Sequence, residues 1–150
     1  MTPPYYPQET DFSCAVACFR MVLAAYGIIK SETELRVLCD CTILGTSALA
    51  LIQAARELGF TASRKYSLRL EDLRDFTAQG YFPIVYGVMT ADVHSLVITA
   101  VSESDVAVLD PKVGARRIAL AEFSELWLPM KNLAVVIALP QDESLMSSHR

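Results

Sequence analysis

The sequence has few of the features that would place it in a membrane or on a nucleic acid. Its apolar runs are too short to cross a bilayer, and its start, Met1-Thr2-Pro3-Pro4, lacks the basic and apolar regions of a signal peptide. Lys and Arg are scattered, and the nearest approach to a basic cluster is Arg116-Arg117. We therefore expect a cytoplasmic protein that binds no nucleic acid.

Cysteine and histidine are scarce as well. The chain has 4 Cys, at positions 14, 18, 39 and 41, and 2 His. Neither the one-turn spacing of Cys14 and Cys18 nor the C-x-C of Cys39 and Cys41 matches the C-x-x-C of common zinc sites, so no structural metal is expected. Cys18, Cys39 and Cys41 are expected to be reduced, partly buried small apolar residues.

The chain does contain a large apolar fraction. Of its 150 residues, 53% are hydrophobic, and its formal net charge is −4, which suits a single domain with one core. Residues 1–140 are expected to form this domain, and the polar residues 141–150 a frayed tail. Helical periodicity in the first half and short β-branched segments in the second predict an α+β fold, with N-terminal helices packed on a C-terminal antiparallel sheet.

Capping and turn residues bound the expected elements. Ser31 and Glu34 have the form of a capping box, and Gly27 and Gly59 are typical helix stops. Helices are expected at about residues 14–26, 32–39, from the turn at 45–47 to 58, 70–79 and 121–127. Strands are expected at about residues 60–66, 82–88, 94–101, 105–110, 115–120 and 133–139.

The stretch Gln8–Gly27 carries the strongest chemical signal. A polar coil leads to Cys14, from which apolar residues recur at helical spacing, so this thiol lies in the first turn of a buried helix. Unpaired N–H groups and the helix dipole favour a thiolate there. Gln8 can direct its side-chain amide at an oxyanion forming beside the sulfur, as in papain-like cysteine hydrolases. Gln8 is also typical of exposed coil, and Asp11 and Ser13 compete to cap the helix.

A thiolate nucleophile needs an acid–base group, and imidazole suits both duties. His149 lies in the polar tail, where a solvated residue is expected. His94 lies where a tight segment enters a buried strand; a lone His there is more often structural, but Cys14 and Gln8 favour a catalytic role. Asp110, which ends the next strand, can orient the imidazole, although Asp before Pro is also a typical turn residue.

Contact between His94 and Asp110 depends on the hairpin that joins their strands. The two residues share a face of the sheet only if the loop has an odd number of residues, such as 103–105, or if a strand carries a bulge. Even then they are not directly opposite, so curvature or a different pairing must close the gap.

In combination these features resemble the C39 peptidase family, the double-glycine leader peptidases of bacteriocin and lanthipeptide export. The resemblance covers roughly residues 5–139, and it rests on Gln8, Cys14, the helix to Gly27, the turn 45–47 before a helix, His94, Asp110-Pro111 and Gly114. Ser13-Cys14-Ala15 departs from the common Asp-Cys-Gly, but Ala is a good helix former. Familiar members are the front domain of an exporter with membrane helices and an ATPase. This chain has neither, so we expect either an excised domain or a free-standing relative.

The resemblance implies a cysteine endopeptidase with Cys14 as nucleophile, His94 as base, Asp110 as its orienting partner and Gln8 as oxyanion donor, without metal or cofactor. It implies cleavage of a precursor peptide after small residues, typically Gly-Gly. It also implies two partners: a leader that docks as an amphipathic helix in an apolar groove, and an ABC exporter that would bring the reaction to the inner face of the membrane. Two alternatives stay open. The same site can serve an acyltransferase or deamidase, or the chain can bind leaders without turnover.

Overall fold

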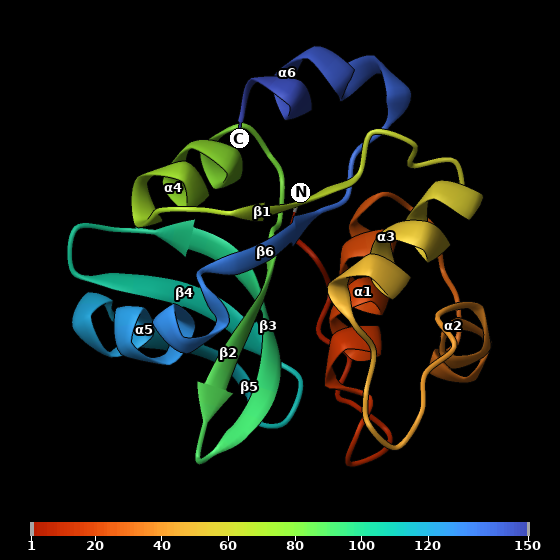
Figure 1. The fold of residues 1–150 in the computed structure, drawn as a ribbon, viewed down its shortest axis with the longest axis horizontal. Coiled ribbons are helices and arrows are strands. Elements are labelled where there is room, and N and C mark those ends of the chain that lie inside the picture. Colours follow the sequence, from red (N-terminus) through yellow and green to blue (C-terminus); the bar gives the residue numbers. More distant parts are fainter. Residues whose placement is uncertain (1, 150) are drawn as a thin grey trace.

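A six-stranded antiparallel sheet stands between two groups of helices in the computed structural model, which describes residues 2–149 (Figure 1). The helices are α1 (Cys14–Ala25), α2 (Glu32–Leu38), α3 (Ala48–Glu57), α4 (Leu70–Ala78), α5 (Leu120–Trp127) and α6 (Glu143–Ser148). The strands are β1 (Arg64–Ser67), β2 (Ile84–Met89), β3 (Asp92–Val101), β4 (Asp105–Asp110), β5 (Gly114–Ala119) and β6 (Leu133–Val136). The predicted α+β fold is confirmed.

The sheet has the strand order β1-β6-β2-β3-β4-β5, so β3 lies inside it, as its apolar sequence predicts. Each face of the sheet is covered by its own apolar core. On one face, buried residues of α1 and α3 pack against Ile84, Tyr86 and Val97. On the other face, α4 and α5 pack against Val85 and Leu96. Both faces of β3 are thus buried, which fixes the strand relative to α1.

Local capping sets the helix ends close to their predicted positions. The N–H groups of Gly27 and Ile28 bond the carbonyls of Ala24 and Leu23, which closes α1 with Gly27 in the left-handed region. The capping box of Ser31 and Glu34 is present at the start of α2. These caps depend only on near neighbours in the chain, which is why the sequence predicts them well.

Two predicted strand boundaries differ most from the structure. Strand β1 begins at Arg64 rather than Phe60, because the N–H of Phe60 bonds the carbonyl of Ala55 in the C-terminal cap of α3. Strand β6 ends at Val136 rather than Leu139. Beyond it, the carbonyl of Ile137 accepts from the hydroxyl of Tyr26 and the N–H of Ala138 donates to Ser63. Contacts with distant side chains replace the strand ladder at this end.

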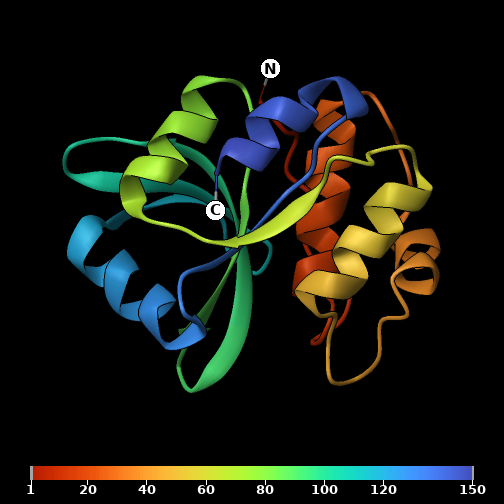
Figure 2. The ribbon, with the colours of Figure 1, turned by 45° about the horizontal axis from the view of Figure 1, so that its top comes forward.

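The expected frayed tail is also wrong for residues 141–149. These residues form a 3₁₀ turn, Pro140–Asp142, and then α6, which lies across the β1 end of the sheet (Figure 2). Met146 is fully buried, and its carbonyl accepts a hydrogen bond from Tyr66. His149, expected to be solvated, stacks on Phe76 with ring centroids 4.4 Å apart. Because this short helix buries only one side chain, its sequence has no apolar periodicity from which a helix could be predicted.

Candidate active site

Cys14 is the first residue of α1, and no side chain caps that helix N-terminus. Ser13 occupies the N-cap position, but its hydroxyl bonds the N–H and carbonyl of Thr10 instead. Asp11 is exposed, so neither of the two expected caps forms. The first N–H groups of α1 therefore remain available to a negative charge on or beside the Cys14 sulfur.

The structure brings His94 and Asp110 into direct contact. Nε2 of His94 lies 2.7 Å from Oδ1 of Asp110, and both side chains are buried. The other ring nitrogen, Nδ1, remains for the hydrogen bond between His94 and Cys14. The sheet position of His94 is the third residue of β3 rather than its first, because β3 extends two residues further than predicted.

A bulge in β3 makes this contact possible. Val101 and Ala100 pair with Val106 and Ala107, whereas Ile98 pairs with Val108, so Thr99 is an extra residue in β3. The loop itself spans only residues 103–104, because Ser102 and Asp105 are still bonded, so the odd loop does not occur and the bulge supplies the shift.

The shifted register explains the face and the distance. If the pairing of Val97 with Leu109 is continued by one residue, Leu96 lies opposite Asp110. Leu96 is two residues from His94, so both side chains, and that of Asp110, point to the same face of the sheet. Without the bulge, His94 and Asp110 would face opposite sides of the sheet. Diagonal neighbours lie within reach of a long side chain, and the imidazole closes that distance.

Each charged group in this trio stabilises the next. Burial would raise the pKa of the Cys14 thiol, but its hydrogen bond to His94, the imidazolium charge and groups of Ser95 lower it. Burial would lower the pKa of His94, but hydrogen bonds and charges of Asp110 and Cys14 raise it to about 9. These opposite shifts favour a thiolate–imidazolium pair at neutral pH.

Asp110 is itself held from several directions. Its Oδ1 also accepts the N–H of Lys112 at 2.9 Å, and its Oδ2 lies 3.3 Å from the guanidinium of Arg116. Burial opposes ionisation of Asp110, but the bonds to His94 and Lys112 and the charge of Arg116 keep its pKa below the usual value. The backbone carbonyl of Asp110 accepts a hydrogen bond from Tyr5 at 2.7 Å. The sequence argument missed Arg116, which only strand pairing brings alongside.

Gln8 lies beside the turn that follows Asp110. Its backbone N–H bonds the carbonyl of Pro111 at 2.9 Å, and its side-chain Nε2 donates to the carbonyl of Thr10 at 2.7 Å. A side-chain amide has two hydrogens on nitrogen, so one remains free for a further acceptor. The next residue is held firmly, since the N–H of Glu9 bonds the fully buried carboxylate of Glu32. No motif in the sequence indicated this role of Glu32.

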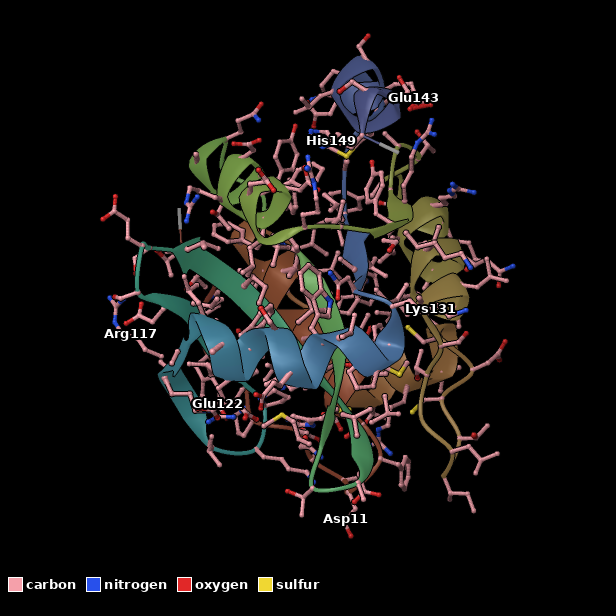
Figure 3. The ribbon with its side chains drawn as sticks, turned by 60° about the vertical axis from the view of Figure 1, so that its left-hand side comes forward. Asp11, Arg117, Glu122, Lys131, Glu143 and His149 are labelled. Atoms are coloured by element: carbon pink, nitrogen blue, oxygen red, sulfur yellow. The ribbon has the colours of Figure 1, made fainter. Side chains whose placement is uncertain are left out.

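A cleft of about 360 Å³ opens over Cys14 and His94. Its walls come from the start of α1, the turn before α3, and β2 and β3, including Asp11, Ile43, Thr46, Tyr86, Val93, Ser95 and Lys112. Figure 3 shows Asp11, at the rim of this cleft, and His149 at opposite ends of the molecule. His149 is therefore remote from the site.

The other cysteines differ from Cys14 in environment. All four are free, and burial raises the pKa of Cys18 well above its usual value and that of Cys39 to about 12. Within residues 2–149, no three His, Cys, Asp or Glu residues are grouped as metal ligands. None of the helices in that range is long and apolar enough to cross a membrane.

A partly exposed cysteine at a helix start, facing a histidine whose second nitrogen binds a buried carboxylate, is the arrangement of papain-like cysteine hydrolases. Comparison with known sequences identifies the family. Residues 2–138 match the Peptidase C39 family, and the chain belongs to that family.

Individual relatives and solved structures extend the comparison. The transport/processing ATP-binding protein ComA of Streptococcus pneumoniae is 34% identical over 128 residues, which are 82% of this chain but 17% of that protein. The chain thus spans about a sixth of the length of that relative. The peptidase domain of Streptococcus ComA shares the fold with a TM-score of 0.78 at 26% identity, over 90% of this chain and 99% of that one. A double glycine motif protease from an AMS/PCAT transporter, solved with its leader peptide, shows the same fold, with a TM-score of 0.74 at 23% identity over 89% of each chain.

Proposed function

We propose that this chain is a cysteine endopeptidase that removes the leader from a precursor peptide at a Gly-Gly type junction. The observation that carries the proposal is that Cys14 and His94 line one cleft and that a buried carboxylate, Asp110, is bonded to the second ring nitrogen of His94. Membership of the peptidase C39 family supports a peptidase, and the geometry supports the cysteine-type mechanism.

In the first half of the proposed reaction, the Cys14 thiolate attacks the carbonyl carbon of the scissile peptide bond. The negative charge that develops on the carbonyl oxygen is bonded by the N–H of Cys14 and the free hydrogen of the Gln8 amide. The imidazolium of His94 then gives its Nδ1 proton to the leaving amine as the C–N bond breaks. The leader remains attached to sulfur as a thioester.

In the second half, neutral His94 removes a proton from water, and the resulting hydroxide attacks the thioester carbon. The C–S bond breaks and the thiolate–imidazolium pair returns. Asp110 holds the ring throughout, because its bond to Nε2 fixes which nitrogen faces the sulfur. An amine in place of water would make the chain an acyltransferase, and a side-chain amide as substrate would make it a deamidase.

An apolar surface beside the cleft supports a leader peptide as the substrate. The turn Thr42–Gly45 exposes Ile43 and Leu44, which are 81% and 94% accessible, and both line the cleft. A second groove of about 500 Å³ continues from Leu44 and Val93 to Met130 and Leu133. We propose that the apolar face of a helical leader binds along this groove and leads the junction to Cys14. An exporter, fused or separate, would bring this reaction to the inner face of the membrane.

Cleavage of a synthetic leader peptide with a Gly-Gly junction tests the proposal. Mass spectrometry of the products should show hydrolysis after the second Gly, and Cys14→Ala should abolish it. Cys41→Ala is the matched control, since Cys41 is also free and partly exposed, and it should retain activity. Binding of the leader without cleavage by the wild-type chain would contradict the enzymatic assignment, and a product joined to added amine would indicate acyl transfer.

The pH dependence gives a second expectation. Activity needs ionised Cys14 and protonated His94; the pKa of the first is lowered and that of the second is raised to about 9. The rate should rise with pH as Cys14 loses its proton and fall as His94 loses its own, near pH 9. A rate that keeps rising through pH 10 would mean that a neutral imidazole and an ordinary thiol share the site.

A further inference from the structure

Ser95, the residue after His94, carries a polar group that nothing in the mechanism above uses. Its side chain is fully buried, and its hydroxyl has no hydrogen-bond partner in good geometry among residues 2–149. Buried hydroxyls without partners are uncommon, because the hydrogen bonds lost to water are not replaced. This hydroxyl could therefore bind an acceptor that appears when the charge state of the site changes.

The sheet directs Ser95 toward α1. Ser95 pairs with Tyr86 across β2, and both Tyr86 and Val97, two residues further along β3, pack in the core that α1 shares. Successive side chains of a strand alternate between faces, so Ser95 points to the α1 side as Val97 does. Ser95 and Cys14 line the same cleft.

Neighbouring groups already have other partners. The hydroxyl of Tyr86 donates to the carbonyl of Thr46 at 2.9 Å, and Nε2 of His94 is bonded to Asp110. The sulfur of Cys14 is an acceptor in the same cleft as Ser95, and groups of Ser95 contribute to the lowered pKa of that thiol. The other titratable groups that line this cleft are His94, Tyr86, Asp11, Asp92 and Lys112.

We propose that Ser95 is a further catalytic residue, whose hydroxyl donates a hydrogen bond to the Cys14 sulfur when that sulfur is a thiolate. Hydrogen bonds to a charged acceptor are the strong ones, so the bond favours the thiolate over the thiol. After the C–S bond forms, the thioester sulfur is a poor acceptor and the bond weakens. Ser95 thus raises the fraction of Cys14 that is thiolate, whereas Gln8 and the start of α1 stabilise the oxyanion. The inference rests on the proposed function only in taking Cys14 as the nucleophile.

Alkylation of Cys14 by iodoacetamide measures this effect without any substrate. The rate on the full chain is followed across pH, with the modified residue identified by mass spectrometry. Ser95→Ala should move the rise in rate to higher pH and lower the rate about tenfold below that rise. Ser63→Ala is the control, since Ser63 is also fully buried but accepts a hydrogen bond from the N–H of Ala138 and does not line this cleft. It should leave the profile unchanged.

A second pair of variants separates the hydroxyl from packing. Ser95→Thr keeps the hydroxyl and Ser95→Val replaces it with a methyl group of nearly the same shape, so any crowding affects both alike. The profile of Ser95→Thr should stay near wild type, and that of Ser95→Val should shift as in Ser95→Ala. Identical profiles for Thr and Val, or a wild-type profile for Ser95→Ala, would overturn the role. Because alkylation needs no peptide, a failure to cleave Gly-Gly junctions would leave this test intact.

Discussion

The β3–β4 hairpin and the segment 8–14 carry the two halves of the proposed site, and the polar groups proposed to act in the reaction are paired more completely on the hairpin. On the hairpin, Nε2 of His94 and both carboxylate oxygens of Asp110 have partners. In segment 8–14, Nε2 of Gln8 uses only one of its two hydrogens, on the carbonyl of Thr10, and the start of α1 has no side-chain cap. In the proposed mechanism, the paired half holds His94 in place before substrate arrives. The unpaired half leaves donors for charge that exists only in the transition state.

The difference between the halves predicts different kinetic consequences. Removing a group from the paired hairpin should disturb the resting state of the nucleophile as well as the reaction. Removing a donor from segment 8–14 should lower the rate of chemistry and leave the resting thiolate unchanged. The following substitutions are ordered from the largest expected effect to the smallest.

His94→Ala should have the largest effect, because it removes the acid–base group and the charge that stabilises the thiolate. Loss of one central member of such a triad typically lowers kcat by about 10⁴–10⁶. The matched control is His149→Ala, which should keep full turnover and lose a little thermal stability, since its ring packs on Phe76. Steady-state cleavage and melting curves measure both. Similar losses of turnover in the two variants would show that the base is misassigned.

Gln8→Ala should lower kcat by about 10²–10³ and leave KM nearly unchanged, because its free amide hydrogen acts in the transition state. Alkylation of Cys14 should keep its wild-type pH profile, in contrast to Ser95→Ala. Gln8→Glu should be at least as damaging, since a carboxylate repels both thiolate and oxyanion. A raised KM with normal kcat would instead make Gln8 a substrate-binding residue.

Asp110→Asn should have the smallest effect, with a loss of about tenfold in kcat, because the Asn carbonyl can still accept the Nε2 hydrogen of His94. Asp110→Ala should cost more, since it also leaves Arg116 without its partner. Cleavage rates of the two variants against wild type measure the difference. Wild-type rates in both would reduce Asp110 to the turn residue of Asp110-Pro111.

Features set by near neighbours were accessible to sequence reasoning. Helix α1 follows from its apolar periodicity and from Gly27, and α2 from the capping box of Ser31 and Glu34. Cys14 could be placed in a helix start, and His94 in a buried strand, because both depend on the pattern within one element. The order helices first, strands second was enough to predict the α+β fold.

Features that depend on weak patterns or on contacts between distant residues could not be predicted from the sequence. Met146 is the one buried residue of helix α6, so the sequence of this helix resembles a polar tail. Strand β1 starts late because Phe60 is used in the cap of α3. Glu32, Arg116 and Ser95 have no motif of their own; each matters only for the residue that the fold places beside it.

The sequence by itself determined which chemistry was possible, because a thiol at a helix start, an imidazole on a strand and a carboxylate before Pro111 are properties of the residues and their local pattern. Only the tertiary structure decided that they meet. One extra residue, Thr99, turns His94 and Asp110 to the same face, and the packing of α1 on β3 brings Cys14 to His94. Register and packing depend on residues far apart in the chain, and a shift of one position would separate His94 from Asp110.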